Sequence, residues 1–184
     1  MKENKIKIGT QTWMSKNLDV TTYRNGDDIP QVKDQKKWTK LTTGAWCYYE
    51  NESANGTTYG KLYNWYAVND LRGLAPKGYH IPTDAEWTIL TDNLGEEAGT
   101  KMKSKTGWDH DGNGTNTSGF AGLPGGFRGS NGNFYNIGAF GIWWSSSEND
   151  TIFAWYRNLY NGNGNVNRGN SSKHYGFSVR CLRD

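Results

Sequence analysis

The chain opens with an alternation of apolar and polar residues. In KIKIGTQTWM, Ile6 and Ile8 alternate with lysines, and Gly9-Thr10 has the composition of a tight turn. Alternation beside a turn is typical of a β-hairpin, because successive side chains of a strand point to opposite faces. The sequence therefore predicts a short N-terminal hairpin. Further on, the aromatic segment GAWCYYEN (44–51) favours a strand.

Two stretches show helical spacing instead. From Leu62 to Asn69 the larger side chains recur every three or four residues, and Gly73 follows. This spacing predicts a short helix within 62–73 that ends at the glycine. A further helix is predicted across Glu96–Lys103.

The segment GYHIPTDAEWTILTDNLG carries the clearest helix signal. Thr83 and Glu86 have the spacing of a capping box, in which the hydroxyl accepts from the Glu86 amide and the carboxylate reaches back to the Thr83 amide. An apolar stripe at helical spacing follows, formed by Trp87, Leu90 and Leu94. We expect Gly95 to end this helix.

Alternation returns near the C-terminus. In GFSVRCL, Phe177, Val179 and Cys181 alternate with Ser178 and Arg180, which predicts a half-buried strand.

The segment AWYRNLY, upstream of that strand, alternates as well. One face would carry Trp155, Arg157 and Leu159, and the other Tyr156, Asn158 and Tyr160. We expect the first face to be buried, together with Val166. The second face, with the rest of residues 149–175, would be a solvent-facing, polar display face.

Composition corrects the impression of a poorly hydrophobic chain. The hydrophobic content is only 34%, but 9 Trp, 11 Tyr and 6 Phe can each bury a large area. The length of 184 residues suits one domain, placed at 1–184. The net charge of +3 forms no basic stripe, which argues against nucleic-acid binding. With no long apolar run and no signal-peptide core, we expect neither membrane insertion nor a signal peptide.

Reactive groups are few. The two cysteines, Cys47 and Cys181, make neither a disulfide framework nor a zinc site, and both a bridge and two free thiols remain open. His80, His110 and His174 have no cysteine or serine partner at a recognisable spacing, and we expect His80 to be a structural hydrogen-bonding residue. No nucleophile elbow, phosphate loop or zinc motif appears. The sequence predicts no catalytic residues.

One segment leaves a calcium site open. In DHDGNG, Asp109, Asp111 and Asn113 would present alternate oxygens to one point, followed by Gly114, as in the first half of a calcium loop. The twelfth position is Phe120 and not glutamate, so an EF-hand is incomplete. An Asx-rich turn is the alternative. Calcium is the one cofactor that the sequence suggests.

Several motifs follow one another along almost the whole chain. They are IGTQTWMSKNLDV, TGAWCYYEN, YGKLYNWYAVND, GYHIPTDAEW, GFAGLPGGFR, WWSSSE and GFSVRCLRD. Together they closely resemble the Fibrobacter major-paralogue domain family, which is similar to the formylglycine-generating-enzyme branch of the C-type lectin fold. The resemblance implies an α+β, C-type-lectin-like fold with two helices around small, twisted antiparallel sheets. Members often have a cysteine where this chain has Ala75, so a family disulfide is not implied here.

The tail, residues 149–175, resembles the variable region of diversity-generating retroelement proteins. There, randomised template adenines convert Asn codons into codons that never encode Lys, Glu, Gln, Met or Trp. The expected ligand-binding residues are all of permitted types: Asp150, Thr151, Ile152, Phe153, Tyr156, Tyr160, Gly162, Gly164, Gly169, Ser171, Ser172, His174 and Tyr175. Asparagines lie among them, and Trp155 and Lys173 would be fixed sites. An Asn/Gly-rich loop region of no special origin is the alternative.

Composition and resemblance together lead to a functional expectation. Tyr, Ser, Gly and Asn dominate antibody paratopes, so the tail has the composition of a binding surface. We expect a non-catalytic protein of the receptor or adhesin type that binds a cell-surface protein or glycan. Its expected location is a bacterial cell surface, the extracellular space or a phage tail. The alternatives are a formylglycine-generating-like enzyme and a carbohydrate-binding module. The enzyme would need a reactive cysteine pair near the C-terminus, where only Cys181 occurs.

Overall fold

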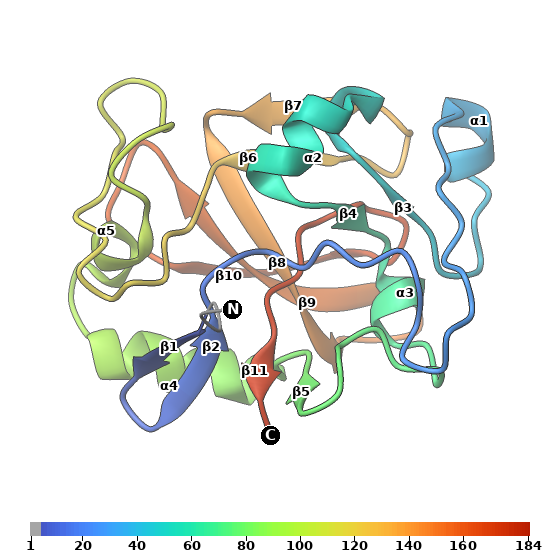
Figure 1. Cartoon of the computed structure of the whole chain (residues 1–184). Coiled ribbons are helices and arrows are strands. Elements are labelled where there is room, and N and C mark those ends of the chain that lie inside the picture. The colour runs from blue at the N-terminus through green and yellow to red at the C-terminus, as the bar shows by residue number, and fades with distance from the viewer. Residues whose placement is uncertain (1–4) are drawn as a thin grey trace.

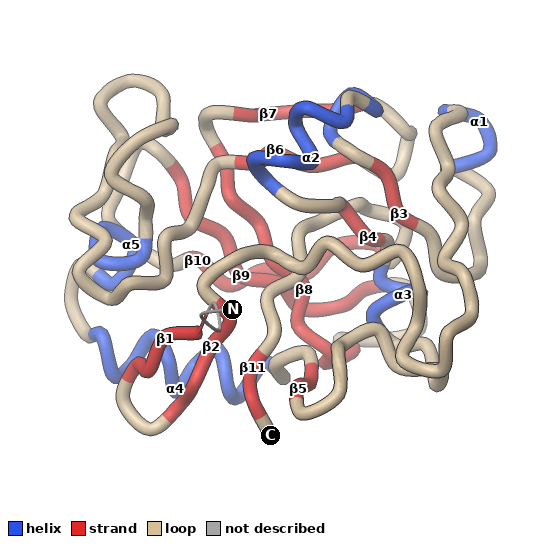
Figure 2. The backbone as a smooth tube through the Cα atoms, viewed as in Figure 1, coloured by secondary structure: helices blue, strands red, loops and turns tan. Residues whose placement is uncertain are grey.

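The computed structural model describes residues 5–184, which form a mixed α+β structure (Figure 1). The helices are α1 (Gln35–Trp38), α2 (Ser53–Tyr59), α3 (Trp65–Val68), α4 (Asp84–Leu94) and α5 (Ala98–Met102), with a 3-10 turn at Tyr49–Asn51. The strands are β1 (Lys5–Ile8), β2 (Gln11–Met14), β3 (Trp46–Cys47), β4 (Leu62–Tyr63), β5 (Tyr79–His80), β6 (Gly125–Arg128), β7 (Phe134–Ile137), β8 (Phe140–Glu148), β9 (Phe153–Tyr160), β10 (Asn167–Ser172) and β11 (Leu182–Arg183). Loops make up most of the chain between α5 and β6 (Figure 2). The predicted α+β class is confirmed.

The strands of the described residues form three sheets. One joins the two ends of the chain in the order β1-β2-β11-β5, and a second pairs β3 with β4. The third has the order β10-β9-β8-β6-β7, so β10 lies at its edge. In this sheet β8 and β9 are antiparallel, with a register shift between Trp144 and Glu148.

Tryptophan side chains fill the interior. Six are almost fully buried: Trp13, Trp38, Trp65, Trp87, Trp143 and Trp144. In one core cluster, Trp87 of α4 packs against Trp13 and Phe120, with ring centroids 4.7 and 5.9 Å away. The aromatic core predicted from composition is therefore present.

Among the locally encoded elements, the hairpin and the capped helix are confirmed, whereas in the segment 44–51 only Trp46–Cys47 is a strand and Tyr49–Asn51 is a 3-10 turn. β1 and β2 pair as a hairpin around Gly9, which has a φ of 59°. At the start of α4, Thr83 Oγ1 accepts from the Glu86 amide at 3.2 Å, and Glu86 Oε2 accepts from the Thr83 amide at 2.8 Å. The helix ends before Gly95, and α5 falls inside the predicted 96–103 range.

The helix predicted within 62–73 is much shorter than expected. Leu62 and Tyr63 are in β4, paired with β3, and only Trp65–Val68 is helical. Asn64 explains the late start, because its side chain accepts from the Ala67 amide and caps the helix there.

The C-terminal segment is neither a continuous strand nor half-buried: Phe177 and Ser178 form isolated bridges, and only Leu182 of the predicted strand lies in β11. Phe177, Val179 and Cys181 are buried as predicted, but Ser178 and Arg180 are only 3% and 1% exposed. Their polar groups find long-range partners, since Asn17 bonds to both side chains. Cys181 and Cys47 are free, buried thiols, which decides the question left open by the sequence.

Candidate ligand-binding surface

The predicted ligand-binding tail includes the hairpin of β9 and β10. Asn167 of β10 pairs with Asn158 of β9, and the register runs to Ser172 opposite Phe153. β9 is flanked by β8 and β10, whereas β10 is at the sheet edge. The hairpin therefore spans the edge of the five-stranded sheet (Figure 1).

One face of β9 packs on α4, and two of its three residues, Arg157 and Leu159, are buried as the alternation predicted. Leu159 is 1% exposed and lies in the core cluster of Trp87 and Trp143. Arg157 Nη1 donates to Asp84 Oδ1 at 2.6 Å, and its Nη2 donates to Thr88 Oγ1 at 2.9 Å. The hairpin is thus tied to the first turns of α4.

Asp84 also holds the edge strand. Arg168 of β10 donates through Nη2 to Asp84 Oδ2 at 2.9 Å, and its guanidinium lies 3.4 Å above the Trp155 ring. Burial acts to raise the pKa of Asp84, but the hydrogen bonds from Arg168 and Arg157 outweigh it and lower that pKa. The ionised carboxylate of Asp84 therefore bonds both strands of the hairpin to α4.

The opposite face of the hairpin is more covered than predicted. Tyr156 and Tyr175 are half-buried against Phe177, with ring centroids 5.2 and 5.5 Å away, and Asn158 is buried. The prediction of a solvent-facing surface is therefore wrong for Tyr156, Asn158 and Tyr175, and also for Asn161, which is buried. The segment after β10 returns across this face and contributes Phe177 to the core.

Two residues expected in the core are at its margin. Trp155 is half-buried because Arg168, and not a core side chain, covers its ring. Val166 is half-buried beside the core cluster of Trp87.

None of the predicted ligand-binding residues, all within the described chain, is buried. Six are exposed: Asp150, Thr151, Ile152, Phe153, Tyr160 and Gly162. The others are half-buried: Tyr156, Gly164, Gly169, Ser171, Ser172, His174 and Tyr175. Ile152, at 58%, is among the most exposed large hydrophobic side chains that the structure describes. The structure thus places the predicted set at the surface along the hairpin and its flanking loops.

The loop before β9 is held by two charged residues. Asp150 Oδ1 accepts from the amides of Ile152 and Phe153, each at 2.8 Å. Lys173 is 6% exposed and donates to Glu148 Oε1 at 2.8 Å and to the Thr151 carbonyl at 3.0 Å. These bonds fix the backbone of the loop that carries the exposed side chains of Ile152 and Phe153.

Two glycines of the predicted set make room for neighbouring rings. A Cβ on Gly169 would lie 2.6 Å from the Oη of Tyr156, its partner across the strands. A Cβ on Gly162 would lie 2.5 Å from the Tyr160 ring, which stacks on Phe140 at 4.7 Å. A side chain at either position requires the tyrosine to move.

The residues of the calcium hypothesis lie in an exposed loop. Asn113 Oδ1 accepts from the Trp108 amide at 3.0 Å, and the Asp109 carbonyl accepts from the Gly112 amide. Phe120, at the twelfth position, is fully buried. Among residues 5–184, no group of three His, Cys, Asp or Glu side chains is arranged to hold a metal ion.

The remaining candidate groups have structural contacts. His80 lies between Glu86 and Asp184, with ring nitrogens 2.9 and 2.8 Å from their carboxylates. His174 contacts Tyr66 edge-to-face at 5.4 Å. Burial raises the pKa of the Cys181 thiol to about 12, so it is protonated at neutral pH.

Sequence reasoning missed Asp84 as the anchor of the hairpin. Its position in the first turn of α4 is visible in the sequence, but its arginine partners lie 73 and 84 residues away. A local pattern carries no signal for such a contact.

The structure thus defines a class: a mixed α+β protein with an aromatic core and a surface-exposed, polar and aromatic hairpin near its C-terminus. The family model described as the Fibrobacter succinogenes major domain matches residues 6–183, and the chain belongs to this family. No curated protein matches the chain, and no solved structure does. None of the helices described for residues 5–184 is long and apolar enough to cross a membrane.

Proposed function

We propose that this protein is a non-catalytic binding protein whose C-terminal hairpin is a ligand surface diversified by a retroelement. In this proposal the fold is C-type-lectin-like, and the protein acts as a receptor or adhesin on a bacterial surface or a phage tail. Its ligand is a protein or glycan on another cell.

One observation carries the proposal. The exposed side chains of residues 149–175 include none of the residue types that adenine randomisation of Asn codons excludes. The two residues of excluded types, Trp155 and Lys173, are anchored beneath Arg168 and beside Glu148. A separation of this kind is expected where a fixed scaffold carries positions that are free to vary.

The chemistry of the exposed positions supports binding. Ile152, Phe153 and Tyr160 are 58%, 37% and 37% exposed, and the first two are adjacent in the chain, so they offer a partner neighbouring apolar groups. Tyrosine adds rigid contact area at low entropic cost. The protonated, buried Cys181 is unsuited to thiolate chemistry of the formylglycine-generating type.

The DNA that flanks the coding sequence tests the origin of the tail. The proposal expects a nearby reverse-transcriptase gene and a near-copy of the segment encoding 149–175, with adenines at the codons of exposed positions. Flanking DNA that holds neither would refute the retroelement part of the proposal.

Binding is tested with a variant of the most exposed large apolar positions within residues 149–175. We expect the triple change Ile152→Ser, Phe153→Ser and Tyr160→Ser to weaken binding by orders of magnitude, because each interface hot spot contributes about 2 kcal/mol or more. These three are preferable to Tyr156 and Tyr175, whose truncation would disturb Phe177. Adhesion of the labelled protein to a panel of bacterial strains and to a glycan array is the measurement.

The matched control is Leu71→Ser, because Leu71 is fully exposed and lies outside 149–175. Equal adhesion by wild type and the triple variant would exclude the hairpin as the binding surface. Binding to simple sugars on the array would favour the carbohydrate-binding-module alternative. Turnover of a thiol-containing peptide would favour an enzyme.

A further inference from the structure

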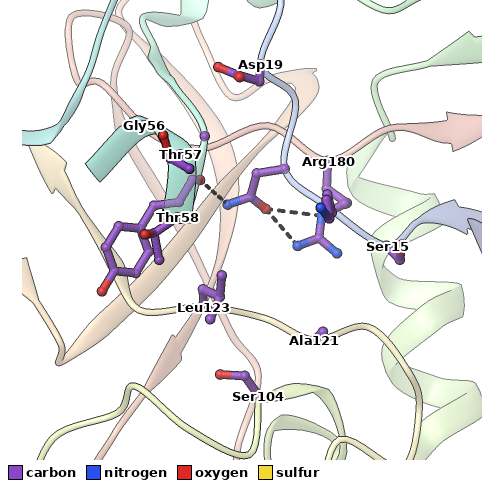
Figure 3. A pocket seen from close by; sticks show the side chains of 13 residues that line it. Ser15, Asp19, Gly56, Thr57, Thr58, Ser104, Ala121, Leu123 and Arg180 are labelled. Carbon is purple, nitrogen blue, oxygen red and sulfur yellow. Dashed lines mark hydrogen bonds between the residues drawn. The ribbon is translucent and has the colours of Figure 1, made fainter. Parts of the chain in front are cut away.

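A cavity outside the hairpin has an unusual charge in its wall. It has a volume of about 340 Å³ and lies between the segment after β2, the end of α2 and the loop before β6. Figure 3 shows the guanidinium of Arg180 in the middle of this pocket, near Ser15, Ala121 and Leu123.

Arg180 is buried without a counter-charge. It is 1% exposed, and its acceptors are Asn17 Oδ1 at 2.7 and 3.1 Å, the Phe120 carbonyl at 2.6 Å and the Met14 carbonyl at 3.2 Å. None of these acceptors is a carboxylate. Burial of an uncompensated charge is costly, and it lowers the pKa of Arg180 to about 9.

The other charged groups leave the cavity positive. Asp19 lines it, but its carboxylate already pairs with the buried Lys61. Lys16, also in the lining, is exposed. The four bonds of Arg180 leave one of its five N–H groups without an acceptor among residues 5–184.

Arg128 shows that a buried arginine alone does not make a site. It is also 1% exposed and donates to the carbonyls of Gly132, Val32 and Lys33. It does not line this cavity. The two arginines are equally buried, so it is the position of Arg180 in the wall of the cavity that distinguishes it from Arg128.

We propose that the cavity beside Arg180 binds a small oxyanion, such as a carboxylate or phosphate group. Arg180 supplies the charge and a free N–H donor, Lys16 attracts the anion to the entrance, and the hydroxyl of Ser15 is a further donor. The site is independent of the hairpin surface and of any partner bound there.

The experiment titrates the wild-type protein with phosphate, sulfate and acetate, with chloride at equal ionic strength as the reference. Two readouts are followed: the melting temperature and the arginine Nε–Hε signals in ¹H–¹⁵N NMR spectra. We expect a saturable rise in melting temperature and a shift of the Arg180 signal, while the Arg128 signal stays in place. The oxyanion that saturates first identifies the preferred chemistry.

Two variants sharpen the test. Lys16→Gln should weaken binding about two- to five-fold, as expected for an exposed charge. Lys77 is also exposed but does not line the cavity, so Lys77→Gln should leave binding unchanged. Asn17→Asp places a carboxylate within hydrogen-bonding distance of Arg180 and should abolish the anion effect.

Three results would overturn the proposal. They are oxyanions that act only as chloride does, a titration that moves both arginine signals equally, and equal weakening by Lys16→Gln and Lys77→Gln. The NMR titration uses the wild-type protein, so it decides the question even if Asn17→Asp fails to fold.

Discussion

Replacing Asp84 by asparagine tests how the hairpin is attached to α4. The substitution preserves shape but removes the charge that Arg157 and Arg168 share. Arg157 is 3% exposed, so it would keep a buried guanidinium without an ionised partner. The free energy of unfolding should therefore fall.

The size of the loss follows from the burial of each group. Removing one partner of a fully buried pair costs about 3–5 kcal/mol. Asp84 is 20% exposed, which reduces this cost, and the pair with the 46% exposed Arg168 adds about 0–1 kcal/mol. Because asparagine can still accept one hydrogen bond, we expect a loss of about 2–3 kcal/mol.

Urea denaturation followed by tryptophan fluorescence measures this loss. Asp92→Asn is the matched control, since it removes the same charge from an exposed position on the same helix. The lowered pKa of Asp84 means that its contribution is present above its unfolded pKa of about 3.9 and is lost as the pH falls through the folded value. The difference between wild type and Asp84→Asn should therefore shrink below about pH 4. Equal stability of the two proteins at pH 7 would contradict the anchoring role.

Three other predictions follow from single side chains. Thr83→Ala should lower stability by about 1 kcal/mol through loss of the N-cap, and superimposable thermal melts would count against it. Hydrogen bonds with Asp184 and Glu86 raise the pKa of His80 against the effect of burial, so its contribution is full below about pH 6.5 and is lost as the pH rises through the folded value. His80→Gln should then destabilise more at pH 6 than at pH 8, and no pH dependence would exclude the bridge. Burial should keep Cys47 and Cys181 unreactive toward a thiol reagent until the protein unfolds, and rapid labelling of native protein would disprove it.

Elements that are determined by contacts between residues close together in the sequence were predicted well. The capping box of Thr83 and the turn at Gly9 act through neighbouring backbone groups, so the sequence around them suffices. The helix predicted from Leu62 is shorter because Leu62 and Tyr63 pair with β3, which is remote in sequence, and therefore form a strand. Helical spacing alone does not report such competition.

The candidate surface was predicted in part for the same reason. Alternation correctly assigned Arg157 and Leu159 to the buried face of β9. It did not predict that the chain after β10 returns to place Phe177 against Tyr156. The buried Arg180 looked like an outward residue because its acceptor, Asn17, is 163 residues away.

The contact between Tyr156 and Gly169 limits the repertoire of tails that this scaffold tolerates. The two positions face each other across the hairpin, and the tyrosine occupies the space that a side chain at 169 would need. A large residue on one strand therefore requires a small one on the other. If both codons vary, acceptable pairs are fewer than the product of the choices at each site. Under the proposed diversification, functional tails should show this as an inverse size correlation between positions 156 and 169.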